Sequence, residues 1–434
     1  METVVVKFGG SSLADAEHFL KVRDIIQGNP ARRYVVPSAP GKRFKGDDKV
    51  TDLLYQCYEA SADEAKLEEV FSRVRERYEQ IIAGLGLTLD LTEEYDRILG
   101  SISHHAGRDY AASRGEYLNG IILANLLGYD FIDAGTVIHF ADNGSFDAEL
   151  TNAILSETLK RHEHAVIPGF YGTMPNGTIK TFSRGGSDIT GSIVARAAGA
   201  SLYENWTDVT GFLMADPRIV DNPRGIDVVT YKELRELSYM GASVLHEDAI
   251  FPVRVAGIPI NIRNTNEPQA DGTMILPAAE PTSTITGIAG KKGFSVVNIE
   301  KDQMNSELGF GRRVLEVLEN LGISFEHLPS GIDTMSVILN SHDIEPYRQR
   351  ILEGITRVVH PDLLNIEDNL ALIAVVGRGM VRSRGTAARI FKALADADVN
   401  IRMIDQGSSE CNIIICVEEA DFENALKAIY KEFE

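Results

Sequence analysis

The sequence has few cysteines and no long apolar run. Its 434 residues include three cysteines, Cys57, Cys411 and Cys416, and no CxxC pair. These features argue against a disulfide framework or a zinc knuckle. No apolar stretch reaches the roughly 20 residues that a transmembrane helix needs, and the first residues lack the basic and apolar regions of a signal peptide. We therefore expect buried free thiols, a cytoplasmic location and no membrane partner.

Basic residues are also scarce. There are 43 lysines and arginines against 63 aspartates and glutamates, which gives a formal net charge of −20. An acidic surface repels phosphate backbones, so we expect no nucleic-acid partner. A small anionic substrate is still compatible, because a local basic pocket can form in an acidic protein. The 44% of hydrophobic residues fits a globular protein, and the length predicts two or three domains.

The first 280 residues alternate between short apolar strands and helices. Strands are expected at 3–8, 34–38, 130–133, 165–170 and 200–206, and helices at 15–27, 61–83, 111–127 and 187–200. This alternation predicts an α/β domain with a mostly parallel open sheet flanked by helices. The segment TMPNGTIKTF predicts a hairpin that turns at Asn176-Gly177. A Pro- and Thr-rich stretch, Gly272–Thr286, marks the expected end of the domain.

The rest of the chain contains an internal repeat. Residues 295–339 align without a gap with residues 371–415, a shift of 76 positions that superposes Met304 on Met380 and Gly309 on Gly385. Each copy reads as a strand, a loop, a helix and two further strands, which predicts two small α+β units. The expected domains are 1–280, 281–365 and 366–434, and interleaving of the last two is left open. Twin units behind a catalytic domain favour a regulatory role.

The first strand ends in KFGGSS. A strand that ends in glycines before a helix leaves backbone N–H groups free to face an anion, and Lys7 adds positive charge at the sheet edge where α/β proteins bind ligands. A plain tight turn with a surface lysine is the alternative on this segment alone.

A second glycine turn lies in TFSRGGSDITGS, residues 181–192. The planar fork of Arg184 suits a carboxylate or a phosphate, while Ser187 or Asp188 can simply cap the helix. Two such turns, one with a lysine and one with an arginine, favour a site for phosphoryl transfer over two unrelated surface loops. The third segment, residues 204–218, can hold a nucleotide, or its Asp-Pro-Arg can be an ordinary turn.

Several motifs in fixed order resemble the aspartate kinases of the amino-acid kinase superfamily. They are KFGGSS, SRGEYLNG (113–120), RGGSD (184–188), WTDVTGFLMADPR and GASVLHEDAI (241–250). The resemblance covers nearly the whole chain, and the twin C-terminal units resemble the two ferredoxin-like ACT domains of that family. It implies the amino-acid kinase fold and ATP-dependent phosphorylation of the side-chain carboxylate of L-aspartate. That reaction is the first step of lysine, threonine and methionine biosynthesis.

The resemblance also implies roles for individual residues. Lys7 would contact the transferring phosphoryl group, and Asp188 would organise Lys7. Glu116 would pair with the α-amino group of aspartate and Arg184 with its α-carboxylate. The implied aspartate-binding set is Thr51, Glu116, Arg184 and Ser187, and the implied ATP-binding set is Lys7, Gly9, Gly10, Ser38, Thr207, Asp208 and Arg218. Mg²⁺ would be held mainly by the ATP phosphates, with no metal ligands from the protein.

The chemistry of the substrate fits such a site. A side-chain carboxylate with a reference pKa of about 3.9 is ionised at neutral pH, so no general base is required. Catalysis then depends on positioning and on neutralising charge. The chain departs from the family where Ser243 replaces a frequent lysine, at Leu213 where the family often has tyrosine, and in its long 40–50 loop. Lys42, Arg43 or Lys45 is a candidate to supply the missing charge.

The resemblance places a regulatory amino acid at the ACT units, with lysine favoured over threonine. The implied pocket consists of Met304, Ser306 and Phe310 in the loop and start of the first helix, and of Ser324, Phe325 and Glu326 on the following strand. Glu326 would accept the ligand's ammonium group. Packing of these residues in an ACT–ACT interface is the alternative. We expect a homodimer through the ACT units.

Parts of the sequence are compatible with two other functions. Another kinase of the same fold, acting on glutamate or acetylglutamate, is disfavoured by SRGE, RGGSD and the ACT pair. A non-catalytic amino-acid sensor is supported by Ser243 and Leu213 and opposed by Lys7 and Glu116. The loop GRGMVRSRG is not a dinucleotide-binding turn, because Arg382 stands at the third glycine position.

Overall fold

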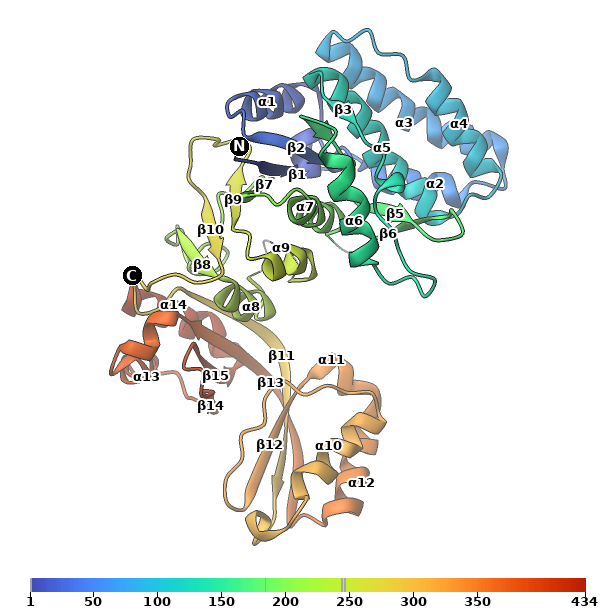
Figure 1. Ribbon diagram of the computed structural model, residues 1–434. Coiled ribbons are helices and arrows are strands. Elements are labelled where there is room, and N and C mark those ends of the chain that lie inside the picture. Colours follow the sequence, from blue (N-terminus) through green and yellow to red (C-terminus); the bar gives the residue numbers. More distant parts are fainter. Residues whose placement is uncertain (1, 184, 243–244, 246) are drawn as a thin grey trace. The chain divides into compact units, whose positions relative to one another are not determined.

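The computed structural model describes residues 2–183, 185–242, 245 and 247–434. The chain divides into two compact units (Figure 1). The first comprises Met1–Phe212, Gly225–Tyr231 and Val244–Ala279, and the second Leu213–Arg224, Lys232–Ser243 and Glu280–Glu434. Within the described ranges, no helix combines the length and the apolar character needed to cross a membrane.

The first unit is built on an eight-stranded sheet in the order β3-β4-β2-β1-β7-β9-β10-β8. Its strands are β1 Val4–Phe8, β2 Arg32–Pro37, β3 Asp130–Phe131, β4 Ala165–Val166, β7 Leu202–Thr207, β8 Val228–Thr230, β9 Ile260–Asn264 and β10 Thr273–Leu276. Every neighbouring pair is parallel except β9 with β10. The mostly parallel sheet is therefore confirmed. The expected strand at 165–170 is shorter, because Pro168 has no N–H to donate to the ladder.

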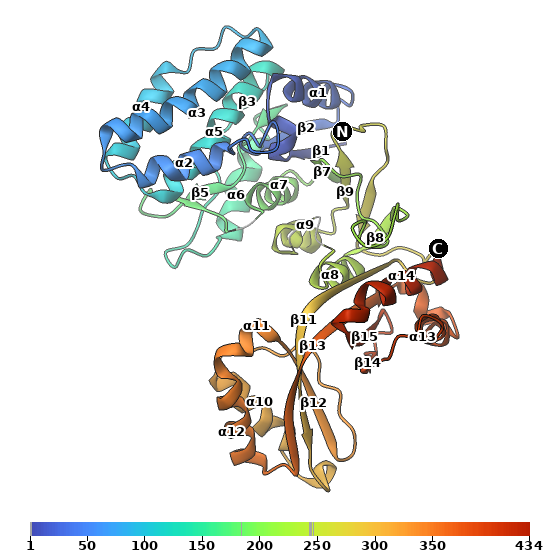
Figure 2. The same ribbon diagram turned by 180° about the vertical axis from the view of Figure 1, so that it is seen from behind.

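Helices cover both faces of this sheet (Figures 1 and 2). The helices of the first unit are α1 Ala16–Gln27, α2 Val50–Glu59, α3 Glu64–Leu85, α4 Thr92–Ser103, α5 Arg108–Leu127, α6 Ala148–Leu159, α7 Gly186–Ala197 and α9 Phe251–Ala256. Helix α8, Tyr231–Tyr239, belongs to the second unit from Lys232 on. The side chains of Asp15 and Asp63 accept hydrogen bonds from the backbone at the starts of α1 and α3, as N-cap residues do. The predicted hairpin is also present, as β5 Tyr171–Thr173 and β6 Ile179–Thr181 with Gly177 at a φ of +83°.

Helix α5 lies in the middle of the first unit. It contacts β2 and β4 of the sheet as well as α2, α3 and α4. Every residue from Ala111 to Gly120 is buried, so the helix is covered on all sides and lacks the polar stripe of a surface helix. This burial places the carboxyl group of Glu116 inside the protein.

The second unit contains a five-stranded antiparallel sheet in the order β12-β11-β13-β15-β14. Its strands are β11 Gly287–Glu300, β12 Thr334–Asn340, β13 Leu363–Val376, β14 Met403–Asp405 and β15 Asn412–Glu418. Strands β11 and β13 have 14 residues each and run through both halves of the unit. Helices α10 Phe310–Asn320 and α12 Arg348–Val359 pair in one half, and α13 Thr386–Asp396 and α14 Phe422–Phe433 pair in the other (Figure 1). The short α11, Ser341–Ile344, follows β12.

The internal repeat is confirmed in three dimensions. Helices α10 and α13 have the same length and are separated by 76 positions. Gly309 and Gly385 precede them with φ of +76° and +84°, a conformation that favours glycine. Met304 and Met380 are both buried in short 3₁₀ turns.

One expected strand of the repeat is wrong. Residues 323–328 form an irregular segment, not a strand, and pair with β12 only around His327 and Ile338. Pro329 follows directly and has no N–H to extend a ladder. Ser324, Phe325 and Glu326 therefore do not lie on a strand.

Candidate active site

Lys7 and Asp188 meet at the carboxyl edge of the parallel sheet. The ammonium Nζ of Lys7, near the end of β1, lies 2.5 Å from Oδ1 of Asp188 in the first turn of α7. Lys7 is 7% exposed. Directly across from Lys7, on β7, is Asn205. The two glycine turns predicted from the sequence therefore do lie side by side, which favours one shared site over two unrelated loops.

The first turn differs from the expectation in one respect. Gly10–Leu13 form a 3₁₀ turn, and α1 starts only at Ala16. The N–H of Gly9 donates to the carbonyl of Trp206 at 3.0 Å, so this N–H is occupied. A Cβ at Gly9 would lie 3.6 Å from Nζ of Lys7, which is an ordinary contact distance, so Gly9 lies directly beside the lysine.

Gly10 allows the β1 and β2 loops to touch. A Cβ at Gly10 would lie 2.7 Å from the carbonyl oxygen of Ala39, a distance that real Cβ atoms do not show. The N–H of Ser38 donates to the carbonyl of Phe8 at 3.0 Å, and the carbonyl of Ser38 accepts from Asn119 of α5 at 2.6 Å. Ser38 thus lies beside the glycine turn, and its contact with the ATP phosphates stays a prediction.

The second turn leads from the β5–β6 hairpin, not from a strand of the main sheet, into α7. Gly185 is the N-cap residue with a φ of +58°. Ser187 and Asp188 follow inside the first turn and make no cap, so the capping alternative is wrong. Ser187 is buried, and its Oγ would lie 2.7 Å from a Cβ at Gly169. Arg184 lies outside the described residues.

Glu116 is a buried acid on α5. Its Oε2 has no hydrogen-bond partner among the described residues. Burial raises the pKa of Glu116 to about 8, against smaller opposing effects of the Ala39 N–H and of Arg114. Arg114 itself is buried and stacks on the rings of Tyr110, Tyr117 and Tyr171. A buried carboxyl group with an unused oxygen is suited to receive a cationic group of a ligand.

Thr51 lies in the first turn of α2. It is partly exposed. Its neighbour Val50 would lie 3.6 Å from a Cβ at Gly115, one residue before Glu116. Thr51 is therefore near the helix that carries Glu116, and its contact with substrate stays a prediction.

The third predicted segment is divided between the two units. Thr207 donates to the exposed Asp208 at 3.2 Å in the first unit. In the second unit, Arg218 pairs with Asp216 at 2.6 Å, and this pairing lowers the pKa of Asp216. The Asp-Pro-Arg sequence therefore forms an ordinary turn held by its own side chains, and a nucleotide role for Thr207, Asp208 and Arg218 stays a prediction.

The long 40–50 loop is fixed by ion pairs. Arg43 donates to Asp47 at 2.9 Å, and Arg77 of α3 donates to the same carboxylate at 2.7 Å. These hydrogen bonds hold the pKa of Asp47 well below its usual range. Arg43 is thus used within the loop, while Lys42 and Lys45 are exposed. Ser243 lies outside the described residues.

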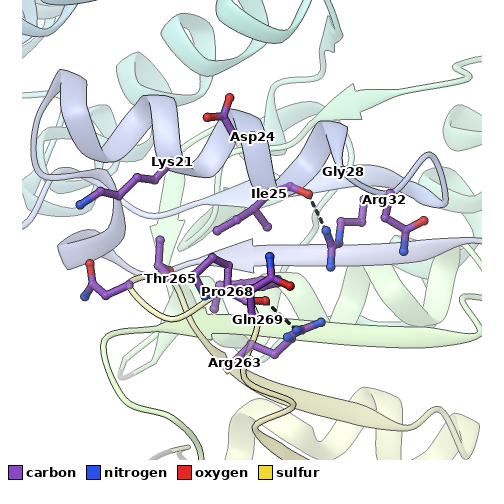
Figure 3. Close-up of a pocket in the computed structure, with 12 residues that line it drawn as sticks. Lys21, Asp24, Ile25, Gly28, Arg32, Arg263, Thr265, Pro268 and Gln269 are labelled. Carbon is purple, nitrogen blue, oxygen red and sulfur yellow. Dashed lines mark hydrogen bonds between the residues drawn. The ribbon is translucent and has the colours of Figure 1, made fainter.

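The opposite face of the sheet holds a cleft of about 700 Å³ between α1 and residues 265–269 (Figure 3). Arg32 donates to Glu204 at 2.8 Å and to the carbonyl of Ile25. Trp206 also donates to Glu204, at 2.8 Å, and Arg263 donates to the carbonyls of Pro268 and Ala270. Because Glu204 accepts hydrogen bonds from both Arg32 and Trp206, we assign these groups to the support of β7.

The residues predicted for the regulatory pocket differ in their burial, and their binding of an amino acid stays a prediction. Met304 and Phe310 are buried in the hydrophobic core of the first ACT half, so they do not offer a ligand an exposed surface. Ser306 donates to the carbonyl of Gln303, and Ser324 and Phe325 are exposed. Glu326 accepts a hydrogen bond from the hydroxyl of Tyr239 at the end of α8.

Sequence reasoning missed two polar side chains of the site, Asn205 and Tyr203. Both lie on β7, are buried and point toward Asp188. The available signal was a polar residue inside the buried strand LYENWT, where an apolar residue is expected.

Comparisons with known proteins agree with this architecture. Residues 2–264 match the model of the Amino acid kinase family, and residues 373–433 match an ACT domain. The chain is 42% identical to Aspartokinase 3 of Bacillus subtilis, with 99% of this chain and 98% of that protein covered. It is 30% identical to the chloroplastic Aspartokinase 1 of Arabidopsis thaliana, with 99% and 80% covered.

Solved structures give the same result. The aspartate kinase of Clostridium acetobutylicum superposes with a TM-score of 0.91 at 51% identity over 100% of both chains. E. coli aspartokinase III in complex with aspartate and ADP gives 0.75 at 25% identity over 99% of both chains. The sheet, the Lys7–Asp188 site and these matches show that the chain belongs to the amino acid kinase family, with ACT domains at its C-terminal end. Within that family it is an aspartate kinase.

Proposed function

We propose that this enzyme transfers the γ-phosphoryl group of ATP to the side-chain carboxylate of L-aspartate, giving ADP and 4-phospho-L-aspartate. The observation that carries the proposal is the Lys7–Asp188 pair at the carboxyl edge of the sheet. The complex of E. coli aspartokinase III with aspartate and ADP supports the choice of substrates.

The site residues would act by positioning and by neutralising charge. The ammonium group of Lys7 would offset the negative charge of the two reacting anions, and Asp188 would fix its position. Glu116 would bind the α-amino group of aspartate. Arg184 would bind the α-carboxylate, with Ser187 and Thr51 beside it.

The nucleotide would lie along the edge formed by the β1 and β2 loops and the segment after β7. Its proposed contacts in the first unit are Lys7, Gly9, Gly10, Ser38, Thr207 and Asp208, and Arg218 stays a candidate from the sequence alone. Mg²⁺ would bind together with the ATP phosphates. The carboxylate of Asp188 is already paired with Lys7, so it is not proposed as a metal ligand. A metal held mainly by phosphates needs few protein ligands.

The ACT halves would carry regulation and assembly. We propose that an amino acid, with L-lysine favoured over L-threonine, binds near Glu326 and inhibits, and that the enzyme is a homodimer. A complex of E. coli aspartokinase III contains lysine and aspartate. The cytoplasmic location stays a prediction.

The test is ADP release with ATP, Mg²⁺ and L-aspartate. We expect turnover with aspartate, none with L-glutamate, and a fall on adding L-lysine. Lys7→Ala should lower kcat by about a hundredfold or more, because it removes a charge that faces the reacting anions. Lys21→Ala, in which an exposed lysine paired with Glu17 is lost, is the matched control and should keep full activity.

Two results would contradict the proposal. Absence of aspartate-dependent turnover in the unaltered enzyme would favour the amino-acid sensor. Full turnover by Lys7→Ala would refute the role of Lys7.

A further inference from the structure

Asn205 joins the two charged residues of the site. Its Nδ2 donates to Oδ1 of Asp188 at 2.7 Å, and its Oδ1 accepts from Nζ of Lys7 at 3.5 Å. Asn205 is 3% exposed and lies opposite Lys7 on the neighbouring strand. Lys7, Asp188 and Asn205 thus form a closed ring of three contacts.

The chemistry of the ring allows one orientation of the amide. The NH₂ group must face the carboxylate, and the carbonyl oxygen must face the ammonium, because the reverse would set acceptor against acceptor and donor against donor. Nδ2 also donates to the hydroxyl oxygen of Tyr203 at 3.5 Å. That hydroxyl also donates to the carbonyl of Asp188 at 3.2 Å.

The backbone around the ring is shaped to permit it. Gly191 of α7 faces Tyr203, and a Cβ there would lie 2.5 Å from the hydroxyl. The absence of a side chain at this position lets β7 and α7 approach closely enough for Tyr203 and Asn205 to reach Asp188.

We propose that Asn205 is a positioning residue, which orients Lys7 and Asp188 for phosphoryl transfer. An ammonium group has three N–H donors. Asp188 and Asn205 take two of them, so the third has a fixed direction and is left for the transferring phosphoryl group. This inference rests on the proposed function. It adds that Asn205 fixes the position of the catalytic lysine.

The first test is Asn205→Ala in the full-length enzyme. We expect kcat to fall by about 10- to 100-fold, since small displacements of reacting groups cost such factors. The KM values for aspartate and ATP should change by less than about threefold, because neither substrate touches Asn205. In a Lys7→Ala background the same substitution should lower kcat no further, since residues that act as a unit are not additive.

The second test is Asn205→Asp, which keeps the size of the side chain. When protonated, the new carboxyl group can donate to Asp188 as the amide does. When ionised, it repels Asp188 from within hydrogen-bond distance. The ratio of variant to unaltered kcat should therefore fall as pH rises from 6 to 8.5. This isosteric variant also covers the case in which Asn205→Ala does not fold.

The control is Asn261→Ala on the adjacent strand β9, a buried asparagine opposite Glu204. It should lower thermal stability and leave kcat unchanged. The proposal is overturned if folded Asn205→Ala keeps the unaltered kcat, if both alanine variants lower kcat equally, or if the Asn205→Asp ratio is the same at every pH. Failure of the proposed function is distinct, because the unaltered enzyme would then show no aspartate-dependent turnover in the same assay.

Discussion

The carboxyl group of Glu116 is the most perturbed acid near the site. Burial raises its pKa to about 8, and one of its oxygens has no partner in the described chain. At neutral pH the ligand-free group is mostly protonated. A bound ammonium group would favour the carboxylate, so substrate binding and ionisation of Glu116 are linked.

This linkage predicts a pH-dependent affinity for aspartate. If only the ionised form binds, KM for aspartate should fall about fivefold from pH 7 to pH 8 and level off above the pKa of about 8. Glu116→Gln should raise KM and remove the pH dependence. Initial rates at varied aspartate and saturating ATP, measured from pH 6 to 9, give the comparison.

The raised pKa of Glu116 can be tested independently through the pH dependence of the protein's stability. The folded pKa of this group lies above the ordinary value of 4.5, so between those two values the folded protein holds a proton that the unfolded chain releases. Stability from this group therefore falls as pH rises from about 4.5 to 8. Glu116→Gln should raise the Tm of ligand-free enzyme at pH 8 more than at pH 5, and an equal change at both would contradict the assignment.

Helix α8 ends, within the second unit, next to a residue of the predicted regulatory pocket. Its last residue, Tyr239, donates from its hydroxyl to Glu326, and Lys291 of β11 donates to its backbone carbonyl. Burial and the Glu326 carboxylate raise the pKa of Tyr239 to about 12, so the hydroxyl stays a donor at neutral pH. Glu326 cannot bind a ligand's ammonium group without sharing or losing this hydrogen bond.

Tyr239→Phe should therefore make the enzyme more sensitive to L-lysine. Without the hydroxyl, Glu326 is free for the ligand, and the lysine concentration that halves turnover should fall by about tenfold or more, the factor expected for a hydrogen bond to a charged group. Turnover without lysine should not change. The measurement is a lysine titration at fixed aspartate and ATP.

Tyr231→Phe is the matched control at the other end of α8, where the hydroxyl donates to the carbonyl of Ile258. It should leave the lysine response unaltered. An equal shift in both variants, or no shift in Tyr239→Phe, would exclude competition for Glu326.

On the scale of the whole molecule, exposed apolar side chains are concentrated in the second unit. They are Leu213, Tyr239, Leu308, Phe325, Ile332, Leu363, Val381 and Ile404. His327, two residues after Phe325, lies 2.7 Å from Asp405, which directly follows Ile404. Exposed apolar groups of this kind favour a subunit interface.

We therefore expect a homodimer that involves exposed apolar side chains of the second unit. The double variant Phe325→Asp/Ile404→Asp should weaken it, because the buried interface would then contain unpaired charge. Light scattering on a size-exclusion column at several concentrations measures the mass. Val255→Asp, at an exposed position of α9 in the first unit, should stay dimeric. A monomeric unaltered enzyme, or a double variant that dimerises as well as the control, would contradict the prediction.

The class of fold and the type of reaction could be predicted from the sequence alone. Alternating strands and helices required a parallel sheet, the repeat of 76 positions required two similar units, and the motif order indicated which residues would form the site. Helix α5 shows no amphipathic pattern in the sequence, because it is covered on all sides. The segment 323–328 was expected to be a strand, but Pro329 follows it and has no N–H group to extend the pairing.

The contacts between the site residues could not be predicted from the sequence, because they depend on the tertiary structure. The register of β1 against β7 places Asn205 opposite Lys7, and the close approach at Gly191 brings β7 to Asp188. Burial of α5 converts Glu116 from an ordinary surface acid into one with a raised pKa. These features depend on distances between segments far apart in the chain, and the local periodicity of a sequence contains no such distances.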